Sequence, residues 1–432
     1  MNNNYSNEEV SFMENIKKKE GNILMIIALF IFMGMQPTII SKSISLFMTP
    51  MSMVRGVGTT EFSAMIAISG LLAAFLAPVT GKLMEKWGVK VLMLVSAILS
   101  IVAFWAISFI TPETVGLLYV IGVINGISQL GLSNVVVSTI ITSWYPGKNK
   151  GTMIGIVMAG SNAFNFMWVN VIGALLAANG DEFYVTLMGI LAVIMAVVSI
   201  PLILFVFKLN PAMDNTASAK KEDTDAAPVD VPGMTMKEAQ KTGVFWLFCL
   251  ALVSMGIVVT GVQMHTNNFL RMECGADAAV AARIWSLAAP CAVLSNLGMG
   301  VLFSKIGEAK TIAIAGVCQV LMAICLILSA TTLNFGYGAT VLYGLSAGVA
   351  TTTPAYLTNV MFGQKEYAKI YGFTMMLFLL GATVGSVITS AVSNASSYVT
   401  MWKIDFVLII ITFAVFLYTI AKSKSNIEAN TQ

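Results

Sequence analysis

The chain has 432 residues, of which 57% are hydrophobic and 10% are charged, and its formal net charge is +3. A soluble domain carries about 25% charged residues, so this composition excludes an ordinary water-soluble protein and indicates a polytopic membrane protein. Basic runs interleaved with aromatic residues are missing, which argues against nucleic-acid binding. The five scattered cysteines have neither disulfide-framework nor metal-ligand spacing, so we expect no metal and no cofactor.

Twelve apolar segments follow one another along the chain. Each is long enough to cross a bilayer, which takes about 20 apolar residues in a helix. The segments are 22–48, 61–80, 90–110, 115–141, 151–178, 183–207, 243–269, 278–303, 310–331, 335–361, 368–394 and 402–422. We therefore predict an all-α polytopic membrane protein with twelve transmembrane helices.

The stretch between the sixth and seventh segments is polar, mixed in charge and rich in Ala, Asp, Lys and Pro, so we expect a flexible linker there. The predicted parts are an N-terminal tail at 1–21, a six-helix bundle at 22–207, the linker at 208–242, a second six-helix bundle at 243–422 and a C-terminal tail at 423–432.

Lysine and arginine fix the expected orientation. With the N-terminus inside, most lysines fall in cytoplasmic loops, whereas the outer face holds Arg55, Arg271, Arg283 and Lys403. The positive-inside rule then predicts that both termini and the linker are cytoplasmic. We expect a multi-pass protein of a cell membrane, such as the bacterial inner membrane.

The stretch ISKSISLFM at 40–48 places Lys42 inside the first apolar segment. Lys42 lies 20 residues after Asn22, about 30 Å along a helix, so it could snorkel to the membrane surface from the end of that helix. The apolar run continues past it with Ile44, Leu46 and Phe47, which favours a position in a pathway through the bundle. The residues alone leave both interpretations open.

Two patterns recur at nearly equal distances along the chain. GKLMEKWGVK at 81–90 and GVLFSKIGEAK at 300–310 share G-x-L-x-x-K-x-G, and their first glycines are 219 residues apart. GKNKGTMIG at 147–155 pairs with GQKEYAKIYG at 363–372, and their last glycines are 217 residues apart. Matched patterns at matched offsets predict two pseudo-symmetric six-helix halves.

The first of these patterns resembles the signature loop between helices two and three of the major facilitator superfamily, G-x-L-x-D-R-x-G-R. The matching positions are Gly81, Leu83, Glu85, Lys86, Gly88 and Lys90. The charges are conservatively changed, and in the second half Ser304 replaces the acid. The resemblance covers nearly the whole chain. It implies a carrier working by alternating access, whose gating loop is Gly81, Glu85, Lys86, Gly88 and Lys90. For Glu85, a solvated turn acid is the alternative.

Further stretches resemble the monocarboxylate transporter family and its bacterial relatives grouped with the oxalate:formate antiporters. SKSISLFMTPM is similar to the first-helix segment in which a lysine points into the central cavity. TSWYPGKNKGTMIGIVMAGSNA resembles the opening of helix five, and MHTNNF resembles the end of helix seven. The resemblance implies that Lys42 binds an organic anion.

The chain departs from that family in helix eight. In APCAVLSNLGMGVLF, Asn296 stands in the place of an arginine and Ala292 in the place of an acid, and helix eleven lacks the second lysine of the oxalate type. The cavity then keeps at most one fixed cation, and a dianion would leave one charge unpaired. We therefore expect a small organic monoanion, a monocarboxylate, as the substrate.

Uncharged polar residues in the segments that line the cavity of this fold are candidates to contact the neutral end of the substrate. With the lysine, the predicted substrate-binding residues are Lys42, Gln36, Asn125, Gln129, Gln263, His265, Asn296 and Tyr343. For each uncharged one the alternative is hydrogen bonding between helices, because polar groups in a bilayer need partners.

Coupling to protons has few candidates. We expect Glu61, Glu85 and Asp405 near helix ends and no acid in mid-helix, and His265 either titrates near neutral pH or is an interfacial hydrogen-bonding residue. Proton symport and anion exchange both stay open. Enzyme motifs are missing, so we expect a monomeric carrier in the lipid bilayer and not an enzyme. The alternative is a multidrug or neutral-solute carrier.

Overall fold

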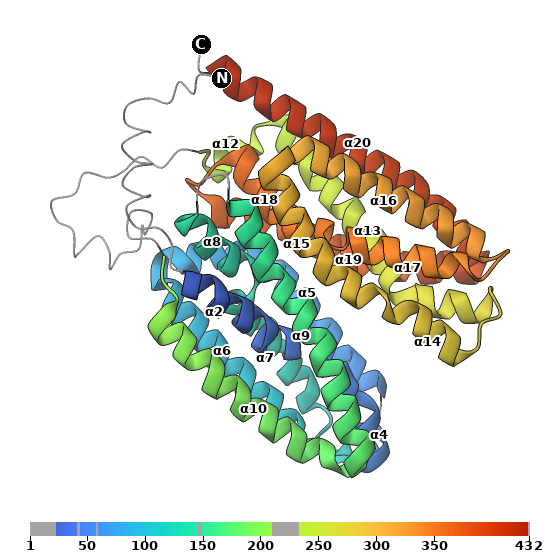
Figure 1. Cartoon of the computed structure of the whole chain (residues 1–432). Helices are drawn as coiled ribbons and strands as arrows, with labels where there is room; N and C mark the ends of the chain where they lie inside the picture. The colour runs from blue at the N-terminus through green and yellow to red at the C-terminus, as the bar shows by residue number, and fades with distance from the viewer. Residues whose placement is uncertain (1–22, 41–43, 58, 146–148, 210–232, 431–432) are drawn as a thin grey trace.

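The computed structural model describes residues 23–40, 44–57, 59–145, 149–209 and 233–430. All regular elements in these ranges are helices. Helices suit such an apolar chain because they satisfy every backbone hydrogen bond within the segment. The helices form two bundles, which approach each other at one end and diverge toward the end that carries α4 and α14 (Figure 1).

The first bundle is built from residues 23–206. It contains α2 (Ile23–Gly34), α3 (Gln36–Thr38), η2 (Ile44–Phe47), α4 (Met48–Arg55), α5 (Thr59–Trp87), α6 (Val89–Ile107), η3 (Pro112–Thr114), α7 (Leu117–Leu132), α8 (Asn134–Trp144), α9 (Lys150–Asn179), η4 (Asp181–Phe183), α10 (Tyr184–Pro201) and a π-helical turn, η5 (Leu202–Val206). Helix α2 packs on α9, and α7 packs on α5 and α6. Aromatic rings fill its core, for example Phe32 edge-on to Phe207 with ring centres 5.2 Å apart.

The second bundle follows the linker. It contains α13 (Gly243–Met272), α14 (Ala278–Ser286), α15 (Ala288–Ile306), α16 (Glu308–Ser329), α17 (Phe335–Ser346), α18 (Gly348–Phe362), α19 (Tyr367–Ala395) and α20 (Tyr398–Asn430). Helix α13 packs on α19 and α20, and α16 packs on α17 and α20. Its core includes Phe248 against Phe416, with ring centres 5.9 Å apart.

Ten helices in the described ranges are long and apolar enough to cross a membrane. The first and tenth predicted segments consist instead of shorter helices, at 23–55 and 335–362, and together these account for the twelve. Large apolar side chains cover the outside of the bundles; Val193 and Val197 on α10 are 62% and 66% exposed. The predicted all-α polytopic fold is confirmed.

Four predicted helices are divided into separate α-helices in the structure. The eighth and tenth keep helical dihedrals at their junctions, Leu287 and Ala347, whereas the first and fourth are interrupted. The first segment, expected at 22–48, ends its first helix at Gly34, whose carbonyl accepts a hydrogen bond from the Trp168 indole at 3.1 Å. The fourth segment breaks at Ser133, which is extended (φ −76°, ψ 159°) between α7 and α8. A mean hydropathy profile misses both breaks, because all pieces of each segment are apolar.

The predicted loop at 81–90 is mostly helix, which corrects that expectation. Helix α5 continues to Trp87, Gly88 makes the turn, and Lys90 already belongs to α6. Gly88 has φ +77°, and Gly307, its counterpart in the repeat, has φ +83° between α15 and α16. Glycine adopts positive φ without the steric penalty of a side chain. The last glycine of the repeated pattern is therefore explained by this turn.

Part of the predicted flexible linker is ordered. Gly233 forms an isolated antiparallel bridge with Gly363, and the Met234 N–H donates to the Phe362 carbonyl at 2.8 Å. The short helix α12 (Met236–Gln240) follows and starts at a capping box formed by Thr235 and Glu238. We call this end of the molecule, where Leu209 and Gly233 border the linker, the linker end. Helix α20 also continues to Asn430, past the expected end at 422.

Candidate functional site

A cavity of about 340 Å³ lies between the two bundles. Most of its wall comes from the first bundle, and Thr351, Met375 and Leu379 of α18 and α19 contribute from the second. The described residues that line it include no charged side chain. The wall is largely apolar, and its polar members are Ser69, Thr80, Asn125, Gln129, Ser133, Asn134, Ser161, Asn162 and Thr351.

Three buried side-chain atoms of the described residues in this wall make no hydrogen bond. They are the Thr80 hydroxyl, the Asn125 Oδ1 and the Ser133 hydroxyl. Thr80 is 1% exposed and Asn125 is 2% exposed. A buried polar group without a partner costs about 1–3 kcal/mol, so each is a group that a bound molecule could satisfy.

Three of the predicted substrate-binding residues relate to this cavity. Asn125 and Gln129 line it together, because a spacing of four residues places both on one face of α7. Lys42 lies outside the described residues. The nearest described residues on either side of the undescribed segment 41–43, Ile40 and Ile44, both line the cavity.

Two predicted residues pack between helices instead. Gln36 is fully buried, and its amide donates to the Ala97 carbonyl at 2.7 Å and to Ser100 Oγ at 2.5 Å, both on α6. Asn296 is also fully buried, and its Oδ1 accepts hydrogen bonds from the hydroxyls of Thr351 and Thr352 on α18. The interhelical alternative therefore describes both residues in this conformation.

The remaining three predicted residues lie in the second bundle, outside the lining of this cavity. Gln263 is exposed on α13. His265 is partly buried, with Nδ1 at 3.5 Å from the Tyr398 hydroxyl. The Tyr343 hydroxyl donates to the Val259 carbonyl at 3.5 Å, and its ring lies 5.2 Å from that of Trp285.

Two residues of the cavity wall, Thr80 and Ser133, are absent from the residues predicted from the sequence. Asp405, expected near a helix end, lies seven residues after the start of α20 and is only 1% exposed, with neither carboxylate oxygen hydrogen-bonded. Ser-Asn at 133–134 inside an apolar segment is a helix-start signal that would have revealed the break. Thr80 carries no such signal.

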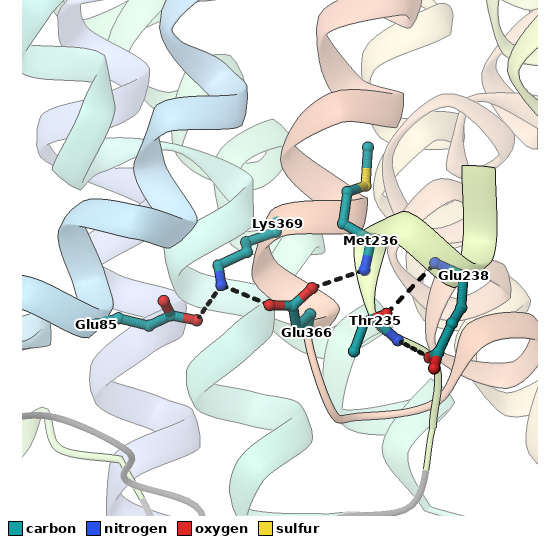
Figure 2. Close-up of polar contacts among 6 residues, drawn as sticks. All are labelled: Glu85, Thr235, Met236, Glu238, Glu366 and Lys369. Carbon is teal, nitrogen blue, oxygen red and sulfur yellow. Dashed lines mark hydrogen bonds and ion pairs between the residues drawn. The ribbon is translucent and has the colours of Figure 1, made fainter. Parts of the chain in front are cut away.

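The bundles are joined at the linker end by a chain of polar contacts, shown in Figure 2. Lys369, in the first turn of α19, lies 3.0 Å from a carboxylate oxygen of Glu85 on α5 and 2.6 Å from one of Glu366. The other Glu366 oxygen accepts the Met236 N–H at 2.6 Å. We call Glu85, Lys369, Glu366 and Met236 the latch. It connects the first bundle, the second bundle and the ordered end of the linker.

The electrostatics of the latch favour ionised Glu366. Burial alone would raise the pKa of the Glu366 carboxyl, but the hydrogen bonds from Lys369 and the Met236 N–H outweigh it and hold that pKa below its usual value. Of the other predicted gating residues, Lys86 is exposed, and Lys90 donates to the Leu204 carbonyl at 3.1 Å within its own bundle.

Further hydrogen bonds cross between the bundles near the same end. Lys150 Nζ donates to Asn359 Oδ1 at 2.5 Å, and the Gln364 amide donates to the Thr142 carbonyl at 3.1 Å. Thr152 and Ser304 place their hydroxyls 2.9 Å apart. These contacts hold the two bundles together at the linker end.

The repeated glycines lie at the closest approaches of the two bundles. A Cβ added to Gly81 would be 2.8 Å from Lys369 N, and one on Gly372 would be 2.4 Å from the Ala77 carbonyl, both where α5 meets α19. A Cβ on Gly155 would be 2.9 Å from the Gly300 Cα, where α9 meets α15. Small residues allow such backbone-to-backbone contact. The internal repeat therefore marks two matching seams between the bundles.

Comparison with protein families finds a match over residues 21–386 to the model described as Major Facilitator Superfamily. Comparison with curated protein sequences finds no match.

Several solved structures are similar to the chain over nearly its whole length. The E. coli fucose:proton symporter FucP matches with a TM-score of 0.68 and 16% identity over 92% of this chain and 98% of its own. The proton:xylose symporter XylE matches with a TM-score of 0.68 and 11% identity over 91% and 95% of the two chains. FucP in the outward conformation matches with a TM-score of 0.64 and 16% identity over 92% and 98%. At these identities the likeness is one of fold.

Proposed function

The chain belongs to the major facilitator superfamily, and from that premise we propose that it is a secondary active transporter of a small organic monoanion, a monocarboxylate. In this proposal the anion crosses the membrane by alternating access, either together with a proton or in exchange for another anion. Within the superfamily, the proposal assigns the chain to the monocarboxylate and oxalate:formate-like branch.

The observation that carries the proposal is that the described residues on both sides of the segment containing Lys42 line the cavity. Ile40 and Ile44 line the cavity on either side of residues 41–43, and the described lining brings no charge of its own. One lysine at such a site matches one carboxylate, because a charge in a membrane interior is expensive unless it is paired. Asn125 and Gln129 would contact the rest of the substrate.

We further propose that the linker end faces the cytoplasm. The support is the concentration of lysines at this end, which the positive-inside rule assigns to the cytoplasm. In that orientation the latch and the glycine seams close the cytoplasmic side, and the cavity belongs to an outward conformation. A membrane-impermeant thiol reagent applied to intact cells should then label Lys403→Cys and spare Lys86→Cys; both residues are exposed. Labelling of Lys86→Cys alone would reverse the orientation.

A neutral solute, such as a sugar, is the second candidate substrate. The uncharged described lining and its several amides and hydroxyls favour it, and FucP and XylE are named as fucose and xylose symporters. A carrier of this kind would not need Lys42, so the same variant separates the two candidates.

The test is uptake into proteoliposomes that contain the purified protein. Radiolabelled lactate, pyruvate, benzoate, fucose and xylose would be offered in turn, with an imposed pH gradient or with preloaded unlabelled substrate. We expect acid uptake by the wild type and its loss in Lys42→Ala. Lys403→Ala is the matched control, because it removes a lysine that is exposed on α20.

The pattern of uptake decides between the mechanisms. Acid uptake that follows the pH gradient would support proton symport, and uptake that requires preloaded acid would support exchange. Sugar uptake that persists in Lys42→Ala, without acid uptake, would refute the anion proposal.

A further inference from the structure

We propose that the carboxylate of the substrate is received at the break between α7 and α8, by the free backbone N–H groups at the start of α8 and the hydroxyl of Ser133. This inference rests on the proposed function and deepens it. It assigns the hydrogen-bonding part of the anion site to a second element of the first bundle, in addition to the charge of Lys42.

The break leaves backbone donors without partners. Ser133 is extended, α8 begins at Asn134, and the first backbone bond back into this helix runs from the Val137 N–H to the Ser133 carbonyl at 3.4 Å. The N–H groups of Asn134, Val135 and Val136 therefore have no intrahelical acceptor. Leu132, Ser133, Asn134 and Val135 all line the cavity, so this helix start adjoins the space that would hold the substrate.

Serine ordinarily prevents this situation by capping the helix. Ser133 is the N-cap residue of α8, but its side chain accepts no hydrogen bond from the helix. Two helix starts in the second bundle show the usual arrangement: Thr242 accepts from the Phe245 N–H, and Asp277 accepts from the Val280 N–H. Asn149, at the start of α9, makes no cap bond either, but it does not line the cavity. At α8 both the capping residue and the N–H groups are left available.

A second observation in the same cavity points independently to a ligand. The Thr80 hydroxyl and the Asn125 Oδ1 line the cavity, are almost completely buried and have no hydrogen-bond partner. Thr80 belongs to α5, which packs against α8, and Asn125 belongs to α7. Three elements thus present unsatisfied polar groups to one enclosed space.

The donors among these groups fit a carboxylate, whereas the Asn125 Oδ1 is an acceptor and would meet a donor elsewhere on the substrate. A helix N-terminus carries about half a positive charge, and its N–H groups point along the axis at a bound anion. The hydroxyls of Ser133 and Thr80 add donors that rotate toward an oxygen atom. Hydrogen bonds of this kind are directional, whereas an ammonium group is a point charge. The α8 start would therefore orient the carboxylate that the lysine attracts.

Asn134→Pro tests the proposal because it deletes one of these N–H groups. Proline is tolerated at the first position of a helix, where the N–H has no intrahelical acceptor. It also requires the preceding residue to be extended, which Ser133 already is. Asn134→Ala removes the same side chain and keeps the N–H, so the ratio between the two variants isolates the backbone donor.

We expect the KM for the transported acid, with lactate, pyruvate and benzoate as probes, to be about tenfold or more higher in Asn134→Pro than in Asn134→Ala, since hydrogen bonds to charged groups are the strong ones. The uncharged amides of the same acids, added as competitors of acid uptake, should have the same inhibition constants in the two variants. Ser133→Ala should raise the KM by about twofold to tenfold, and it decides the matter if Asn134→Pro does not fold.

Equal KM values in Asn134→Pro and Asn134→Ala, or an unchanged KM in Ser133→Ala, would overturn the inference and leave the anion proposal intact. If Asn134→Pro raises the KM relative to Asn134→Ala but Lys42→Ala transports acids normally, the inference is supported and the role of Lys42 is overturned. Failure of the wild type to bind or move any acid would overturn both.

Discussion

Gly300→Ala should open the seam between α9 and α15. Gly300 is the first glycine of the repeated pattern in the second half of the chain. A Cβ at this position would lie 2.4 Å from the Gly151 carbonyl oxygen and 3.0 Å from the Gly155 Cα. Both are backbone atoms, so they cannot move aside as the end of a flexible side chain can. The two helices must separate to accept the methyl group.

The size of the effect follows from this geometry. An ordinary contact begins near 3.4 Å, so the helices must move apart by about 1 Å, and overpacking of this kind costs about 1–3 kcal/mol. The penalty applies to the state that is closed at the linker end and disappears when the bundles separate there. The ratio of the open to the closed state should therefore rise by about 5- to 150-fold.

The measurement is the distance between spin labels at Lys86 and Lys305 in a variant without the native cysteines. Both positions are exposed at the linker end, one in each bundle. We expect Gly300→Ala to shift the distance distribution toward longer values. The radiolabelled acid would then be bound with lower apparent affinity from the side that the present cavity faces.

Gly298→Ala is the matched control. It lies on the same helix, and an added Cβ would meet nothing within 4 Å. Both substitutions raise the helix propensity of α15 to the same extent, so their difference measures the contact alone. Identical distance distributions for the two variants would show that the seam does not hold the bundles together, and the reasoning would fail.

Three further predictions concern the latch and the cavity. Glu85→Gln should raise the ratio of the open to the closed state by about 1.5- to 5-fold, as expected for a partly exposed ion pair. Lys369→Gln should raise it further, because Lys369 contacts the carboxylates of both Glu85 and Glu366. No change in the spin-label distances in either variant would count against the latch. Because the pKa of Glu366 is lowered in the latch, its contribution to the stability of the closed state is complete above the usual glutamate pKa. That contribution is lost only as the pH falls through the lowered value. The distance distribution should therefore stay constant from about pH 7 to about pH 5, and a transition inside that window would contradict this sign. Asn125→Leu should raise the KM for the transported acid by about twofold to tenfold. It should not lower the thermal unfolding temperature, because Asn125 Oδ1 has no hydrogen-bond partner to lose. An unchanged KM would remove Asn125 from the site.

The first helix shows how far sequence reasoning reaches. Its apolar length predicts a membrane segment, and this part of the expectation needs no tertiary information. The interruption after Gly34 has a local signal in Pro37, which has no N–H to continue the helix. The bond from the Trp168 indole to the Gly34 carbonyl, by contrast, joins residues 134 apart in sequence. Local patterning contains no trace of this bond, because the partner belongs to another helix.

The candidate site shows the same division. A polar residue in an apolar helix must find a partner, so the sequence can identify Gln36, Asn125 and Asn296 as significant without saying what they touch. In the structure, Gln36 bonds to α6, Asn296 bonds to α18, and Asn125 Oδ1 is left to the cavity. The three residues lie on different helices, so the packing of those helices decides which partner each one meets.

Composition and hydropathy determine the class of this protein, because only helices can carry so many apolar residues through a bilayer. The recurring glycines Gly81, Gly155, Gly300 and Gly372 allow the two halves to approach closely, because small residues permit contact between backbones. The tertiary structure alone decides which polar groups remain unsatisfied, and it leaves those of Thr80, Asn125 and Ser133 facing one cavity. The physical reason is that hydrophobic burial is a property of each segment, whereas a hydrogen bond requires two particular atoms to meet.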